Sequence, residues 1–171
     1  MTVLDREYFK QDAVTVAKDI VGKLLCVNMN GKTVKMRITD TEAYLGSDDT
    51  ACHAHKGRTA RTEVMFCQGG VTYIYLCYGI HYMLNIVTGE KDSPQAVLIR
   101  GLEGVYGPGR LTKQLGITKT LNNKELCTAN GIWVEQSSES VKIKKGKRIG
   151  IAYADEKDRN RLWRFTIDSN Q

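Results

Sequence analysis

Apolar residues recur at helical intervals near the start of the chain and alternate with polar residues through much of the rest. The segment DAVTVAKDIVGKLL (12–25) spaces its apolar side chains mostly three or four positions apart. This spacing predicts a helix, with Asp12 as its N-cap. The next stretch, 24–44, predicts two strands joined at Asn30-Gly31, because this dipeptide favours the tight turn of a hairpin.

Most of the remaining chain has the β-branched and aromatic composition of strands. One helix is expected in GPGRLTKQLGI (107–117), with Pro108 near its start and Leu111 and Leu115 on one face. The mixture predicts an α+β fold: a single domain over residues 1–171, with a mainly antiparallel curved sheet and flanking helices. The other strands are expected in 71–89 (two strands, broken near Gly79), 96–103, 131–136, 147–154 and 162–167.

Length and charge narrow the class of protein. The 171 residues, 42% of them hydrophobic, fit one domain with a real core. The net charge of +6, from 25 basic and 19 acidic residues, suits a polyanionic partner. The chain contains no apolar run of membrane-spanning length and no signal-peptide pattern at its start, so we expect no membrane association. The five cysteines, without a Cys-x-x-Cys, favour a reducing cytoplasmic setting over a disulfide framework or zinc knuckle.

A carboxylate and an aromatic residue lie close together in TEAYLGSDDTACHAH (41–55). In a strand, Glu42 and Tyr44 point to the same face. A carboxylate beside an aromatic ring in a cleft can activate a water molecule or stabilise a developing cation. The alternative is a glutamate exposed at a strand end beside a half-buried tyrosine.

The end of the same segment has the His-x-His spacing of some metal sites. His53 and His55 follow Cys52, and the only other histidine is His81. The zinc deaminase pattern, His-x-Glu with Cys-x-x-Cys, is absent from the sequence. A polar loop is the alternative, and we expect no metal.

Tyrosines crowd the segment TYIYLCYGIHYMLN (72–85). Tyr73 and Tyr75 share one face of a strand, whereas Tyr78 precedes Gly79 and is expected to project from a bend. Aromatic rings outside the core can stack on bases or wedge between them. The alternative is an aromatic core strand.

Two polar residues interrupt apolar strand patterns. Asn85, in the strand after this bend, carries an amide that can read a base edge. Arg100 lies within VLIRGLE and is expected to pair with a carboxylate, for which Glu42 is a candidate. Positioning a phosphate backbone would need basic groups on one side of a cleft, and the candidates flanking the motifs are Arg58, Arg61, Arg110 and Lys113.

Several of these segments occur together and in order: TEAYLGSDDTACHA, MF, VTYIYLCYGIHYMLNIV, AVLIRGLE, GPGRLTKQLGI and RIGIAYADEKDRNRLWRF. In this combination the chain resembles the alkyladenine (3-methylpurine) DNA glycosylases of the single-domain type, from about the first helix to the terminal strand. His81 stands where members of the family often carry an aromatic residue.

The resemblance implies a role for each motif residue. Glu42 matches the residue that positions and deprotonates the hydrolytic water, and Arg100 matches the residue that helps to hold this water. Asn85 matches a pocket-floor amide that excludes guanine, and Tyr78 matches a side chain that wedges into the duplex. The walls that sandwich the flipped base would be Tyr44, His53 and Tyr75.

The implied activity is monofunctional hydrolysis of the N-glycosidic bond of a damaged purine in double-stranded DNA. A monomer without a cofactor is expected, and Arg100 is expected to keep Glu42 ionised. Two alternatives remain: a non-catalytic nucleic-acid-binding module, and a metal-dependent hydrolase that uses Cys52, His53 and His55. The Gly-x-Gly in GPGRLTKQLGI also has a superficial likeness to a helix-hairpin-helix turn.

Overall fold

The computed structural model describes residues 2–168, and its first α-helix is the short α1 (Ala13–Asp19). Asp12 caps this helix, as predicted, and accepts a hydrogen bond from the Thr15 N–H at 3.0 Å. The helix ends earlier than the apolar pattern predicts, because Gly22 adopts a φ of +93° and Leu24 already begins the first strand. The last apolar residues of the pattern therefore lie in a strand that pairs with its neighbours, and not in the helix.

The predicted hairpin at Asn30-Gly31 is confirmed. Strand β1 (Leu24–Met29) and strand β2 (Lys32–Tyr44) pair from Met29 opposite Lys32 back along β1. Both turn residues have positive φ, +49° and +78°, as a two-residue turn of this kind requires.

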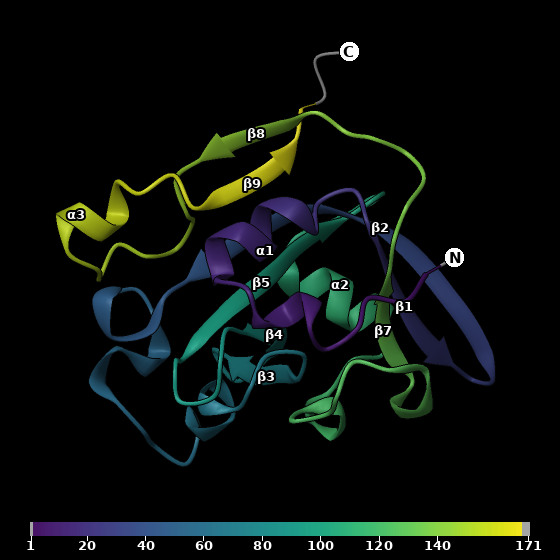
Figure 1. Cartoon of the computed structure of the whole chain (residues 1–171), viewed down its shortest axis with the longest axis horizontal. Helices are drawn as coiled ribbons and strands as arrows, with labels where there is room; N and C mark the ends of the chain where they lie inside the picture. Colours follow the sequence, from purple (N-terminus) through teal and green to yellow (C-terminus); the bar gives the residue numbers. More distant parts are fainter. Residues whose placement is uncertain (1, 169–171) are drawn as a thin grey trace.

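The strands of the described residues form one curled, wholly antiparallel sheet (Figure 1). Its main path runs β3-β4-β5-β2-β1-β7, β6 pairs with β5, and β9 joins β2 to β8. The remaining strands are β3 (Thr72–Cys77), β4 (His81–Thr88), β5 (Gln95–Leu102), β6 (Val105–Tyr106), β7 (Ile132–Glu135), β8 (Ile143–Gly146) and β9 (Arg164–Ile167).

Helices pack on this sheet and share one core with it. The helix α1 contacts β2 and β5, and α2 (Pro108–Gln114) contacts β4 and β5. Leu111 and Leu115 of the α2 region are buried in that core, and Pro108 is at the helix start, as predicted. A one-turn helix, α3 (Glu156–Arg159), lies near the β8–β9 pair (Figure 1). Short 3-10 turns cover Tyr8–Lys10, Gly46–Asp48, His53–Lys56, Glu63–Phe66, Lys119–Leu121 and Thr128–Asn130.

The α+β prediction is confirmed, and one predicted strand is wrong. Residues 147–154 form no strand; the nearby strand is β8, which ends at Gly146. The alternating pattern fails here because the chain turns at Gly150, where φ is +74°, and the Ile149 N–H bonds a side chain instead of a neighbouring strand. Across residues 2–168, no helix has the length and apolar character needed to cross a membrane.

Candidate active site

Alternation along four strands brings the key polar side chains into one row. Tyr73 on β3 lies opposite Asn85 on β4, Asn85 lies opposite Leu98 on β5, and Leu98 lies opposite Glu42 on β2. Residues directly opposite each other in a sheet point to the same face. The register therefore gathers an amide and a carboxylate that are far apart in sequence.

A cavity of about 470 Å³ opens over this row. Residues of β3, β4 and β5 form its floor, and the loops at 51–53, 61–65 and 149–153 close its sides. The predicted site residues that line it are Tyr44, His53, Arg61, Tyr75, Tyr78, Asn85 and Arg100.

Glu42 lies beneath this lining and has 0% of its surface exposed. Its Oε2 accepts a hydrogen bond from the Tyr44 hydroxyl at 2.7 Å, and its Oε1 accepts one from the Ile149 N–H at 2.7 Å. Arg100 Nη1 lies 3.7 Å from Oε1, which confirms the predicted pairing. Since a carboxylate has about four acceptor positions, Glu42 retains capacity to bind a water molecule.

Arg100 favours the ionised form of Glu42, as expected, but burial acts in the opposite direction. Burial raises the pKa of Glu42, and this outweighs the lowering effects of Arg100, the Tyr44 hydroxyl and the Ile149 N–H. A carboxylate with a raised pKa is a stronger proton acceptor once it is ionised.

The Tyr44 ring is fixed from behind by a buried arginine that the sequence pattern did not single out. The Arg148 guanidinium lies 4.8 Å from the Tyr44 ring centroid. It forms a bidentate pair with Asp49 at 2.6 and 2.8 Å, and neither side chain is exposed. Nothing in the basic run at 142–148 distinguishes Arg148 from its exposed neighbours, because its partner lies 99 residues away.

His53 and Tyr75 form one continuous aromatic wall. Their ring centroids are 4.5 Å apart and nearly perpendicular, so a base has no room between them. His53 Nδ1 lies 3.0 Å from the Tyr73 hydroxyl. Burial and the charge of Arg61 both lower the pKa of His53, so its imidazole is neutral at physiological pH.

Tyr78 lies at the mouth of the cavity, and Asn85 lies at its floor. Tyr78 is 92% exposed and has a φ of +51° in the turn between β3 and β4, so it projects from the bend as predicted. Asn85 is 4% exposed, and its Nδ2 donates to the Tyr73 carbonyl at 3.2 Å. That hydrogen bond fixes the orientation of the amide.

The four basic residues expected to contact phosphates have different surroundings. Arg58 pairs with Glu63 and Asp92 and stacks on Phe66. The side chain of Arg61 is exposed and lies over the Tyr75 ring at the rim of the cavity. The other two, Arg110 and Lys113, lie on α2 beside a shallow depression next to Tyr106.

The residues of the alternative metal site diverge. His55 Nδ1 donates to the Ser47 carbonyl at 2.8 Å, while His53 faces Tyr73. Burial raises the pKa of the Cys52 thiol to about 11, which opposes the thiolate form that metals bind. Across the part of the chain that the structure describes, no three His, Cys, Asp or Glu side chains are grouped to hold a metal ion.

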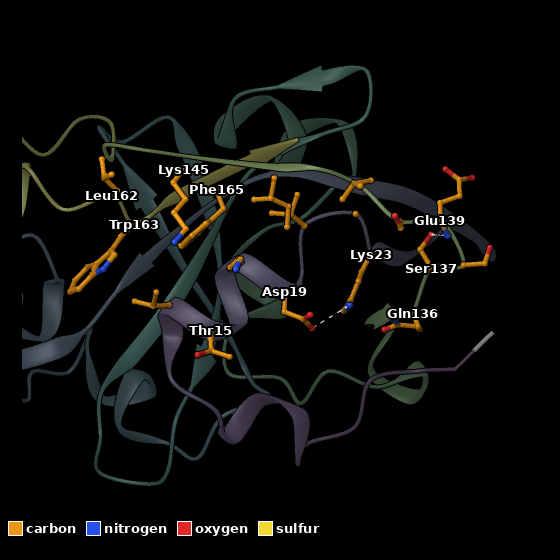
Figure 2. A pocket seen from close by; sticks show the side chains of 18 residues that line it. Thr15, Asp19, Lys23, Gln136, Ser137, Glu139, Lys145, Leu162, Trp163 and Phe165 are labelled. Carbon is orange, nitrogen blue, oxygen red and sulfur yellow. Dashed lines mark hydrogen bonds and ion pairs between the residues drawn. The ribbon is translucent and has the colours of Figure 1, made fainter. Parts of the chain in front are cut away.

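A second cavity, of about 880 Å³, lies between α1, the serine-rich segment 136–141 and the β8–β9 pair (Figure 2). Its lining shares no residue with the cavity over Glu42. Two of its acids are partnered, because Asp19 pairs with Lys23 at 3.3 Å and Glu139 pairs with Arg37 at 2.6 Å. Trp163 and Phe165 supply its aromatic surface (Figure 2).

Comparison with known proteins gives matches over nearly the whole chain. Residues 7–106 and 103–171 match the model of the methylpurine-DNA glycosylase family. A relative from Borrelia garinii subsp. bavariensis is 44% identical over 98% of this chain and 97% of its own length. Relatives from Natranaerobius thermophilus and Desulfitobacterium hafniense are 42% and 37% identical over 98% and 100% of this chain, and 96% and 98% of their own lengths. All three carry the provisional name of a 3-methyladenine DNA glycosylase.

A curled antiparallel sheet with a buried carboxylate under an aromatic cavity is therefore the scaffold of a DNA-repair hydrolase of N-glycosyl bonds. The chain belongs to the methylpurine-DNA glycosylase family, which confirms the resemblance seen in the sequence.

Proposed function

We propose that this protein flips a damaged purine out of double-stranded DNA and hydrolyses its N-glycosidic bond, leaving an abasic site. The substrates would be of the 3-methyladenine, 7-methylguanine, hypoxanthine or ethenoadenine class. The observation that carries the proposal is Glu42, a fully buried carboxylate that is hydrogen-bonded to Tyr44 of the cavity wall. A nucleic-acid-binding module would have no use for such a group.

Base flipping gives the aromatic cavity its role. A base inside the stack is out of reach of a buried carboxylate, so the nucleotide has to leave the duplex. Its base would stack against the joined wall of His53 and Tyr75, with Tyr44 as the other wall. Tyr78, 92% exposed at the cavity mouth, would fill the space left in the duplex and offset part of the unstacking energy.

Glu42 and Arg100 would carry out the hydrolysis. Glu42 would accept a proton from water as the water oxygen bonds to the sugar C1′ and the bond from C1′ to the purine nitrogen breaks. The carboxylate would also stabilise the cationic sugar, and Arg100, 3.7 Å away, would help to hold the water. Because burial raises the pKa of Glu42, excision should fall on acidification at a less acidic pH than an exposed glutamate would give.

The remaining residues would provide selectivity and affinity. Asn85, fixed by the Tyr73 carbonyl, would exclude guanine through its 2-amino group. Arg110 and Lys113 would neutralise phosphates from α2, and Arg58 would do so at the cavity rim in competition with its own carboxylate partners. The protein would act as a monomer without a cofactor.

The test is excision from duplex oligonucleotides that each carry one defined lesion. The wild-type protein should release the damaged base, and the strand should break only after alkali treatment, because the described residues that line the cavity include no lysine to act as a Schiff-base nucleophile. Strand cleavage without alkali would contradict monofunctional hydrolysis. If none of the lesions is released, the proposed activity is wrong.

A further inference from the structure

Arg61 differs from the other arginines around the cavity in having no carboxylate partner. Arg58 pairs with Glu63 and Asp92, Arg100 pairs with Glu42, and Arg148 pairs with Asp49. Among residues 2–168, no Asp or Glu oxygen lies within ion-pair distance of the Arg61 guanidinium. Its positive charge is therefore not neutralised by the protein.

This charge lies at the exposed rim of the cavity over Glu42. The Arg61 Cζ is 4.8 Å from the centroid of the Tyr75 ring, and Arg61 lines the cavity together with His53 and Asn85. Its charge reaches neighbouring groups: it adds to burial in lowering the pKa of His53, and it opposes the burial that raises the pKa of Tyr73. The guanidinium thus occupies the face of a ring on which a flipped purine would stack.

The damaged purines of the proposed function differ in charge when they bind, so they also differ in charge when they leave the sugar. When the C1′–N bond breaks, its electron pair goes to the purine. A purine methylated at N7 of guanine or N3 of adenine enters as a cation and leaves neutral. Hypoxanthine enters neutral, so the electron pair places negative charge on it, which a proton or a nearby positive charge has to balance. A fixed positive charge beside the purine repels the first kind and stabilises the departure of the second.

We propose that Arg61 is a specificity-determining residue that favours neutral damaged purines over cationic ones. The inference rests on the proposed function. As the base enters, the guanidinium moves from the face of Tyr75 to the edge of the purine, where it stabilises the negative charge that develops on a neutral base. A cationic purine instead has to displace a like charge from an aromatic surface that would otherwise attract it.

The experiment compares single-turnover excision rates on two duplexes that differ only in the lesion, hypoxanthine or 7-methylguanine. Arg61→Met keeps apolar contact with Tyr75 and removes the charge, whereas Arg61→Lys keeps the charge. We expect Arg61→Met to lower the ratio of the hypoxanthine rate to the 7-methylguanine rate about tenfold or more. Arg61→Lys should recover most of the ratio. Lys56→Met, an exposed lysine on the same loop, should leave both rates unchanged.

The outcomes separate this proposal from a simple phosphate contact. A phosphate contact would slow both lesions alike in Arg61→Met and leave the ratio at its wild-type value, which would overturn the proposal. An unchanged ratio with unchanged rates would overturn it as well. Failure of the wild-type protein to excise either lesion would instead refute the proposed function. Thermal unfolding of each variant checks that the fold is intact.

Discussion

The cavity over Glu42 is smaller than the cavity beside α1, but it lies over a more unusual set of buried polar groups. The first is about 470 Å³ and the second about 880 Å³. At the smaller cavity, a buried amide and several aromatic rings lie above a carboxylate with no exposed surface, and these groups come from strands that are distant in sequence. In the larger one, Glu139 keeps 70% of its side chain exposed and is paired with Arg37.

The difference shows that the burial of charge locates a site better than volume does. Removing a carboxylate from water is unfavourable unless other groups compensate, so a fold that retains one needs several partners for it. Glu42 has Tyr44, Ile149 and Arg100. An ion pair at the surface of the α1 cavity requires no such arrangement and contributes little.

The largest effect is expected from the same substitution made in both cavities. Glu42→Gln removes the proposed base and should slow excision by about 10²–10⁴-fold, the usual contribution of a general base. Glu139→Gln should leave the rate unchanged. Single-turnover excision of hypoxanthine measures both, and similar losses in the two variants would remove the distinction between the cavities.

The buried ion pair behind Tyr44 should make the next largest contribution, and its effect is on stability. Asp49→Ala leaves the Arg148 guanidinium buried without its partner and should lower the free energy of unfolding by about 3–5 kcal/mol. Glu139→Ala, at the exposed pair with Arg37, should change it by less than about 1 kcal/mol. Urea-induced unfolding measures both, and an Asp49→Ala protein as stable as Glu139→Ala would show that the buried pair is not required.

A smaller effect is expected at the cavity mouth. Tyr78→Ser should weaken binding to a lesion-containing duplex by about 1–3 kcal/mol, the scale of one stacking contact. The loss should be smaller for a lesion in single-stranded DNA, where no gap has to be filled. Leu162→Ser, which alters a residue at the α1 cavity that is 51% exposed, should not change DNA affinity. An equal loss on both substrates would point to a folding defect.

The smallest effect concerns selectivity at the cavity floor. Asn85→Ser should open room for the 2-amino group and raise the rate of guanine excision relative to hypoxanthine about tenfold, as expected for one unsatisfied buried group. The measurement is the ratio of the two single-turnover rates. A folded variant with the wild-type ratio would place selectivity elsewhere.

The local elements could be predicted because their determinants are local. The Asp12 cap and the Asn30-Gly31 turn depend on neighbouring residues, and both are present in the structure. The segment 147–154 was predicted wrongly because its backbone serves a distant carboxylate: the Ile149 N–H bonds Glu42, 107 residues away. Alternating apolar residues carry no information about such a contact.

The candidate site divides in the same way. The resemblance to the glycosylase family pointed to Glu42, Tyr44 and Arg100, and the structure brings them together. The partnership of Arg148 with Asp49 depends on tertiary packing, as does the position of Arg61 over Tyr75. In the sequence these arginines resemble any other members of a basic surface.

The central claim is that the ionised carboxylate of Glu42 faces a positive charge at the sugar. It is tested most directly by the binding of two uncleavable duplexes with abasic-site analogues: a protonated pyrrolidine, which places a cation at the sugar, and a neutral tetrahydrofuran. The wild-type protein should bind the pyrrolidine duplex at least about tenfold more tightly, because it imitates the charge of the transition state. Glu42→Gln should lose this preference. If Glu42→Gln is folded and keeps it, the positive charge is recognised by another group and Glu42 is not the base.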